Sequence, residues 1–197
     1  MNLLTLRLTA YQDAGYAARY QAVVARVEAA ERTLPAQGGD LRLTRTVARY
    51  LYKLMAYKDE YEVARLYTDG SFARALKADL QGGRRITLHL APPILARPDP
   101  VTGRPKKMTF GPWMLGAMRV LAAMKRLRGT AFDPFGPTAE RRKERQLIED
   151  YIARIDSLLP RLAPATRATI RDIAAGPARI PGSGPAKDSN PRTAGTE

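Results

Sequence analysis

Apolar side chains that recur every three or four residues run through most of this 197-residue chain. That spacing places them on one face of an α-helix, whereas a half-buried strand alternates apolar and polar residues. The clearest stripe follows Thr138, a predicted helix cap, and comprises Leu147, Ile148, Tyr151, Ile152, Ile155, Leu158 and Leu159. The pattern predicts an α+β fold that is mostly α, with about six helices.

Other stripes predict the remaining helices. One helix is expected over residues 10–34 and a second through the tyrosine-rich segment that ends at Gly70, because proline or glycine follows each stripe. The helix that starts at Trp113 meets few charges before Lys125, so it is predicted to be the central buried element. Shorter helices are predicted at residues 71–80 and 164–176.

A single segment changes to the period of a strand. Ile86, Leu88 and Leu90 alternate with polar residues, and the turn-forming residues 99–103 follow. Residues 107–110 can return as a second strand. One small β-hairpin is therefore predicted near residues 85–110, and no other β structure is expected.

Length and composition limit the organisation and chemistry. A chain of this size favours one domain, predicted over residues 1–175, while proline, glycine and small polar residues predict a disordered tail over 176–197. The absence of cysteine excludes thiolate-ligated zinc and iron–sulfur clusters, and one histidine excludes a histidine-rich metal site. The apolar run at the N-terminus is too short for a signal peptide, so a cytoplasmic location is expected.

The net charge of +14 is unevenly distributed. Residues 84–145 carry fourteen basic and four acidic side chains, a net charge of +10. Such a segment can bind phosphates or attract an anionic partner, but a solvated surface gives the same count. No recognition motif for nucleic acid accompanies the charge, so nucleic acid is the least favoured partner.

Three dense motifs lie in one order along the chain. They read YLYKLMAYKDEYEVARLYTDG from Tyr50, HLAPPILARPDPVTGRPKKMTFGPWML from His89, and FDPFGPTAERRKER from Phe132. Together they resemble the C-terminal region of the large indolepyruvate:ferredoxin oxidoreductases, thiamine-diphosphate and iron–sulfur enzymes that decarboxylate aryl 2-oxoacids. The resemblance extends more weakly to LTAYQDAGYAARY from Leu8, and it is strongest over residues 50–145.

The resemblance implies an accessory domain rather than a complete enzyme. That family uses thiamine diphosphate with magnesium and 4Fe–4S clusters, but its Gly-Asp-Gly magnesium motif has no counterpart in this sequence. The chain is too short for the thiamine and cluster domains, so it is expected to be a separately encoded or truncated piece that is not catalytic alone. No catalytic, cofactor-binding or metal-binding residue is predicted. The family's terminal Gly-Phe-Gly-His-type motif is replaced by Gly182-Ser-Gly-Pro185.

The partners implied by the resemblance are proteins. They are the thiamine- and cluster-bearing domains or subunit of the same enzyme and its acidic acceptor, ferredoxin. Self-association is expected when such a partner is missing, and no membrane is expected to be involved.

A basic run on the helix after Thr138 is the best candidate for binding a partner or an anion. Arg141 and Arg145 share a helix face, and an arginine pair fits a carboxylate or phosphate. The predicted surface comprises Arg141, Arg142 and Arg145, with Lys106, Lys107 and residues 132–135. Local neutralisation by Glu140 and Glu144 is the equally weighted alternative.

Two polar features have plainer interpretations. His89 is the only side chain of a type that titrates near neutrality, and it could carry a proton or bind an anion, but a structural strand histidine is more common. The acids and bases of the second helix are Lys53, Lys58, Asp59, Glu60 and Glu62. Neighbours on a helix point about 100° apart, so these groups are expected to form a charge network rather than an acid–base site.

Two other classes of function remain open. The basic segment alone suggests an independent small basic protein that binds nucleic acid or another polyanion, with affinity that falls steeply with salt. An enzyme centred on His89 ranks last, because the sequence supplies no partner constellation for it.

Overall fold

The computed structural model describes residues 3–35, 41–70, 72, 74, 88–90 and 108–179. The chain forms two compact units. Unit 1 comprises Met1–Tyr57 with Thr138–Glu197, and unit 2 comprises Lys58–Pro137. One domain was predicted over residues 1–175. That the two units unfold together, as one domain would, stays a prediction. The helix expected over 71–80 lies almost wholly outside the described residues, as does the predicted tail from residue 180 onward.

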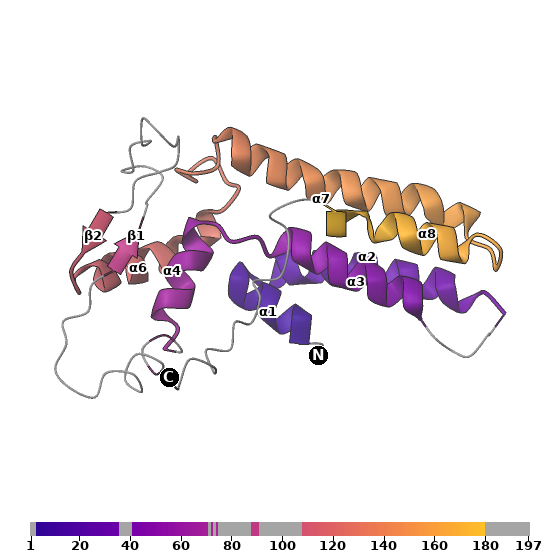
Figure 1. The fold of residues 1–197 in the computed structure, drawn as a ribbon, viewed down its shortest axis with the longest axis horizontal. Coiled ribbons are helices and arrows are strands. Elements are labelled where there is room, and N and C mark those ends of the chain that lie inside the picture. Colours follow the sequence, from indigo (N-terminus) through magenta and orange to yellow (C-terminus); the bar gives the residue numbers. More distant parts are fainter. Residues whose placement is uncertain are drawn as a thin grey trace, which may run out of the picture. The chain divides into compact units, whose positions relative to one another are not determined.

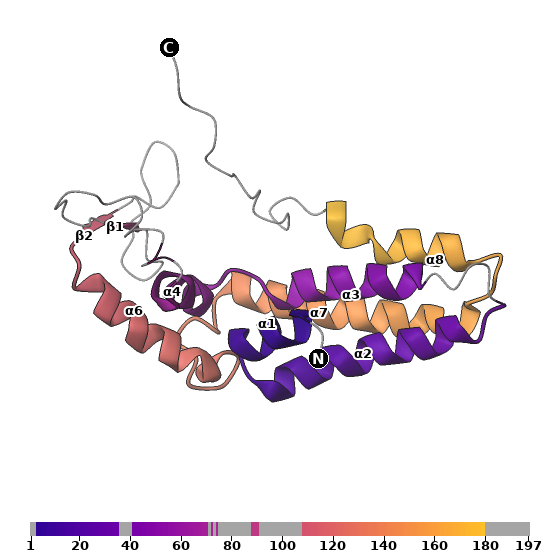
Figure 2. The same cartoon turned by 90° about the horizontal axis from the view of Figure 1, so that it is seen from below.

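Unit 1 is helical throughout its described residues. Its elements are α1 (Leu3–Tyr11), α2 (Ala14–Arg32), α3 (Arg42–Met55), α7 (Ala139–Leu158) and α8 (Arg167–Ala174), with 3-10 turns at Leu159–Arg161 and Gly176–Arg179. Helix α3 contacts α2, α7 and α8, and α1 packs against α2. Figures 1 and 2 show α2, α3, α7 and α8 side by side.

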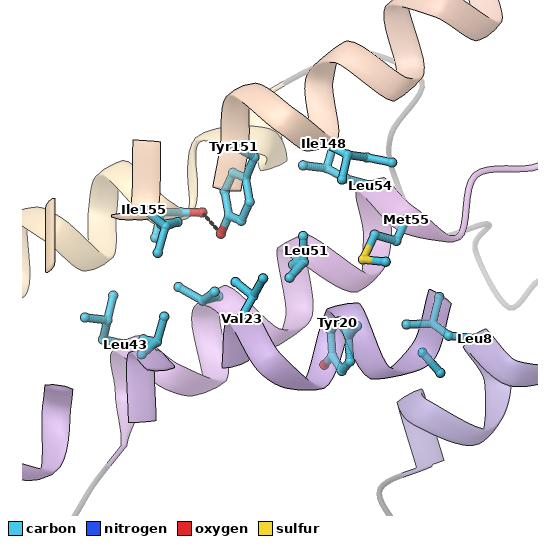
Figure 3. Close-up of a cluster of buried hydrophobic side chains, with 14 of the residues drawn as sticks. Leu8, Tyr20, Val23, Leu43, Leu51, Leu54, Met55, Ile148, Tyr151 and Ile155 are labelled. Atoms are coloured by element: carbon cyan, nitrogen blue, oxygen red, sulfur yellow. Dashed lines mark hydrogen bonds between the residues drawn. The ribbon is translucent and has the colours of Figure 1, made fainter. Parts of the chain in front are cut away.

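The core of unit 1 is built on the helix-period stripes. Leu43, Val47 and Leu51 on α3 are fully buried, and Ile148 and Ile155 on α7 are nearly so (Figure 3). Full burial of each such aliphatic side chain stabilises the fold by about 1.5–3 kcal/mol. The stripe predicted after Thr138 is therefore confirmed as the buried face of α7.

Tyrosine hydroxyls join neighbouring helices of unit 1. Tyr20 donates to the Ala48 carbonyl at 3.1 Å and Tyr151 donates to the Ala174 carbonyl at 2.9 Å. These bonds satisfy hydroxyls that would otherwise be buried without partners. Burial raises the pKa of Tyr20 to about 12, so this residue stays protonated across the physiological range.

The helix predicted over residues 10–34 is in fact two helices. Asp13 has an extended backbone between α1 and α2, and its carboxylate accepts the Tyr16 amide at 2.8 Å. Aspartate at this position satisfies an amide that has no partner within the new helix. Because buried Leu8 and Tyr11 continue the apolar stripe across the break, periodicity alone did not show it.

The second predicted helix is also broken. It ends at Met55, and α4 (Glu60–Thr68) begins after Asp59, whose carboxylate accepts the Glu62 amide at 2.8 Å. The stop at Gly70 is confirmed, since this glycine has φ of +85°, a conformation that other residues rarely adopt.

Unit 2 contains the predicted hairpin. Strand β1 (Leu88–Leu90) pairs antiparallel with β2 (Met108–Phe110), with Leu88 opposite Phe110 and His89 opposite Thr109. The other elements are α4, α6 (Met114–Ala123) and a 3-10 turn at Met124–Leu127, and α4 packs against α6. The chain is thus mostly helical as predicted, with seven α-helices among the described residues instead of about six.

The prediction that the Trp113 helix is the central buried element is wrong. Trp113 is 66% exposed and Val120 64% exposed, and Met118, at 7% exposed, is the one buried residue of α6. A helix that is apolar on every side does not indicate which side will be covered. Within unit 2, α4 covers one side of α6.

We expect Glu31→Ala to destabilise unit 1 strongly. Glu31 is 4% exposed and accepts the Leu43 amide, the Thr44 amide and the Thr44 hydroxyl at 3.0, 2.8 and 2.7 Å. Without this carboxylate, the Leu43 and Thr44 amides in the first turn of α3 lose their acceptor. This should lower the free energy of unfolding by roughly 3 kcal/mol. Urea unfolding followed by circular dichroism measures this loss. The control is Glu28→Ala, because Glu28 is partly exposed and pairs with Arg32; an equal loss in both variants would contradict the capping role.

Candidate anion- and partner-binding surfaces

Arg141 belongs to the fold of unit 1. It is 9% exposed, its guanidinium lies 5.3 Å from the centre of the Tyr57 ring, and it forms an ion pair with Glu144. The pairing with Glu144 is the local neutralisation that the sequence left open. Arg141 was expected to present an exposed charge. That expectation is wrong, because its guanidinium packs against the Tyr57 ring in a buried position.

The other residues of the predicted basic surface are placed differently. Arg142 is exposed and Arg145 is half-buried on α7, both in unit 1. Phe132 and Phe135 belong to unit 2, with exposed fractions of 81% and 8%. Lys106 and Lys107 lie outside the described residues, as does the side chain of His89. Binding by these residues therefore stays a prediction.

The sequence missed a buried ion pair in unit 2. Arg128 donates to both carboxylate oxygens of Asp59 at 2.5 and 2.8 Å, and the side chains are 5% and 2% exposed. The guanidinium also lies 5.3 Å from the centre of the Tyr61 ring. The partners are 69 residues apart, and no local spacing indicates such a pair.

Asp133 organises the connector that follows α6. Its carboxylate accepts the Gly129 amide at 2.7 Å, the Tyr61 hydroxyl at 2.9 Å and the Phe135 amide at 3.1 Å. Burial by itself would raise the pKa of Asp133, but these donors bring it below the ordinary value. A side chain at Gly136 would approach the Asp133 carboxylate to 3.0 Å, which explains the glycine. This network is structural.

An apolar helix face is exposed in unit 2. Trp113, Ala117 and Val120 follow one another at steps of four and three, so they share one face of α6, and all three are exposed. Arg119 and Arg126 are exposed on the same segment. Burial and the nearby charges of Arg65, Arg128 and Arg126 lower the pKa of Lys125. The apolar face is therefore combined with positive charge.

A second surface, which we call the arginine seam, runs between α3 and α8 of unit 1. Two hollows of about 230 Å³ each lie along it. The first is lined by Arg45, Thr46, Arg49, Tyr50, Arg171 and Ala175. The second is lined by Arg42, Leu43, Pro164, Arg167, Ala168 and Arg171. The seam was not predicted because its arginines lie outside the basic segment 84–145, although steps of three and four on α3 and a step of four on α8 were a signal.

Comparison with known proteins gives one match. A family model described as a family of unknown function, DUF6537, matches residues 4–197. The chain belongs to this family. No curated protein and no solved structure matches it. The description of DUF6537 gives no activity, so the relationship to the oxidoreductases stays a prediction.

Other features were sought across the part of this DUF6537 chain that the structure describes. Within those ranges no group of three or more histidine, aspartate or glutamate side chains could hold a metal ion. None of the described helices is long and apolar enough to cross a membrane.

We expect Arg141→Glu and Arg142→Glu to differ sharply in stability. Charge reversal at Arg141 places a second carboxylate beside Glu144 in a buried position, which should cost roughly 3 kcal/mol. The same change at exposed Arg142 should alter the free energy of unfolding by less than about 0.5 kcal/mol. Thermal and urea unfolding of both variants measure the difference. Equal free energies of unfolding for the two variants would show that burying Arg141 does not stabilise unit 1.

We expect Asp133→Asn to destabilise unit 2 at neutral pH and much less in acid. A carboxyl group whose pKa is lowered on folding stabilises the folded state above the unfolded pKa of about 3.9, and the contribution is lost as the pH falls from there through the lower folded pKa. The loss at neutral pH should be about 1–3 kcal/mol. Urea unfolding at several pH values measures it, with exposed Asp172→Asn as the control. A gap that persists in strong acid would contradict the assignment.

Proposed function

We propose that this chain is an accessory, structural domain of a cytoplasmic indolepyruvate (2-oxoacid):ferredoxin oxidoreductase. In this role it docks the catalytic domains or the electron acceptor and does not carry out the chemistry. The thiamine diphosphate, magnesium and 4Fe–4S clusters of such an enzyme would be held by those other domains.

The observation that supports docking is the exposure of bulky motif residues. Trp113 lies near the end of the motif that begins at His89, and Phe132 opens the motif that ends at Arg145. Both resemble the oxidoreductase family, yet their side chains are 66% and 81% exposed. Side chains that stay exposed do not stabilise the core, so packing within this chain does not explain these bulky residues. A partner that covers them explains them better.

The chemistry of α6 suits a protein partner. Tryptophan and arginine are enriched in the energetically important centres of interfaces. The exposed cations Arg119 and Arg126 would attract an acidic surface such as that of ferredoxin. An apolar contact with a basic border fits an electron-transfer partner that must also dissociate.

We expect Val120→Glu to weaken docking at least about tenfold, the effect of losing one well-buried contact at an interface. The measurement is biolayer interferometry against the thiamine- and cluster-bearing chain of the oxidoreductase from the same organism. Leu6→Glu is the matched control, because Leu6 is also an aliphatic residue on an exposed helix face, at 45%, but lies in unit 1. Both variants should keep the melting temperature of the unchanged chain.

Several results would contradict the proposal. The unchanged chain could fail to bind the catalytic chain, or both glutamate variants could bind equally well. Tight binding of thiamine diphosphate by the isolated chain, or 2-oxoacid-dependent reduction of a dye, would assign the chemistry to this chain instead.

A second candidate function is an independent small basic protein that binds a polyanion. The arginine seam of unit 1 favours anion binding. The basic segment 84–145, which first suggested this function, belongs mostly to unit 2. Retardation of DNA or RNA at low salt, with affinity that falls steeply as salt is added, would support this alternative.

A further inference from the structure

The arginine seam has a regular geometry. Arg42, Arg45 and Arg49 occupy one face of α3, and Arg167 and Arg171 are one turn apart on α8. The α3 arginines span about 10 Å of helix axis, at 1.5 Å per residue. Arg171 lines both hollows, so the two hollows adjoin.

Two arginines of the seam carry charge that no acidic group among the described residues offsets. Asp172 pairs with Arg171 at 3.1 Å from a largely exposed position. The Glu31 carboxylate accepts hydrogen bonds from the Leu43 and Thr44 amides, and it therefore occupies the start of α3. Among the described residues, neither Arg49 nor Arg167 makes an ion pair. Lys53 adds a further cation, 5.8 Å from the centre of the Tyr50 ring at the edge of the first hollow.

We propose that the arginine seam binds a small molecule that carries a diphosphate or triphosphate, with nucleoside triphosphates as the representative class. The guanidinium fork fits phosphate oxygens in pairs, and each hollow is lined by three arginines. Each hollow is smaller than the roughly 300–1,000 Å³ of pockets that enclose a whole drug-sized ligand. The hollows therefore receive the phosphate groups, and the rest of the ligand lies outside.

The length of the seam argues against a polymeric ligand. Proteins that bind nucleic acid through the backbone neutralise roughly 6–10 phosphates along an extended track. The seam offers a track of only about 10 Å, which matches one short polyphosphate. A single carboxylate of an acidic peptide would engage one guanidinium fork, whereas a polyphosphate can engage several. This inference concerns unit 1 alone and does not rest on the docking function proposed for unit 2.

The test is calorimetric titration of the full chain with sodium triphosphate and with ATP at moderate salt. We expect one molecule bound per chain. Arg49→Gln with Arg167→Gln removes one arginine from each hollow, and binding should weaken at least about tenfold for the lost charge-assisted contacts. Arg7→Gln with Arg154→Gln is the matched control, because both arginines are exposed in unit 1 and line neither hollow.

The unchanged chain decides the proposal even if the double variant unfolds. Failure of triphosphate and ATP to bind would overturn the proposal, as would equal weakening in the control variant. Binding confined to a single-stranded oligonucleotide or a glutamate-rich peptide would also overturn it in favour of those ligands. Arg49→Lys keeps the charge but loses the fork, so intermediate affinity supports phosphate recognition. Val120→Glu should bind ATP normally, which separates this result from failure of the docking function.

Discussion

A buried carboxylate is stable only where hydrogen-bond donors satisfy it, and this constraint determines how both units are assembled. Glu31 on α2 is held by amides at the start of α3. Asp59 receives the guanidinium fork of Arg128, and Asp133 gathers the amides of the connector after α6. Each carboxylate fixes where one element begins relative to another, and the apolar helix faces pack around that arrangement. Removing one donor group would therefore disturb more than a single contact.

The two surfaces proposed for recognition differ in their physics. The exposed face of α6 is apolar around Trp113 and Val120 with exposed arginines beside it, so contact there would combine removal of apolar area from water with a smaller, salt-sensitive attraction. The arginine seam is dominated by charge, so binding there weakens as ions screen it. The surfaces belong to different units and are built from different residues, so a substitution in one leaves the lining of the other unchanged.

Much of the secondary structure could be predicted from local patterns. The hairpin was correct because alternation at Leu88 and Leu90 is bounded by turn-forming residues, and Thr138 caps α7 as its position indicated. The breaks at Asp13 and Asp59 were missed because the apolar stripe continues past each of them. A capping aspartate looks like any surface acid until the backbone around it is known.

The sequence by itself determined the helical class, the hairpin and the stripe on α7. Periodicity and turn chemistry are local, so they can be read without the fold. Only the tertiary structure decided that Asp59 meets Arg128, that Arg141 is buried, and that α6 leaves Trp113 exposed. These outcomes depend on which segments pack together across tens of residues. Burial and pairing are properties of that packing, and no local spacing in the chain encodes them.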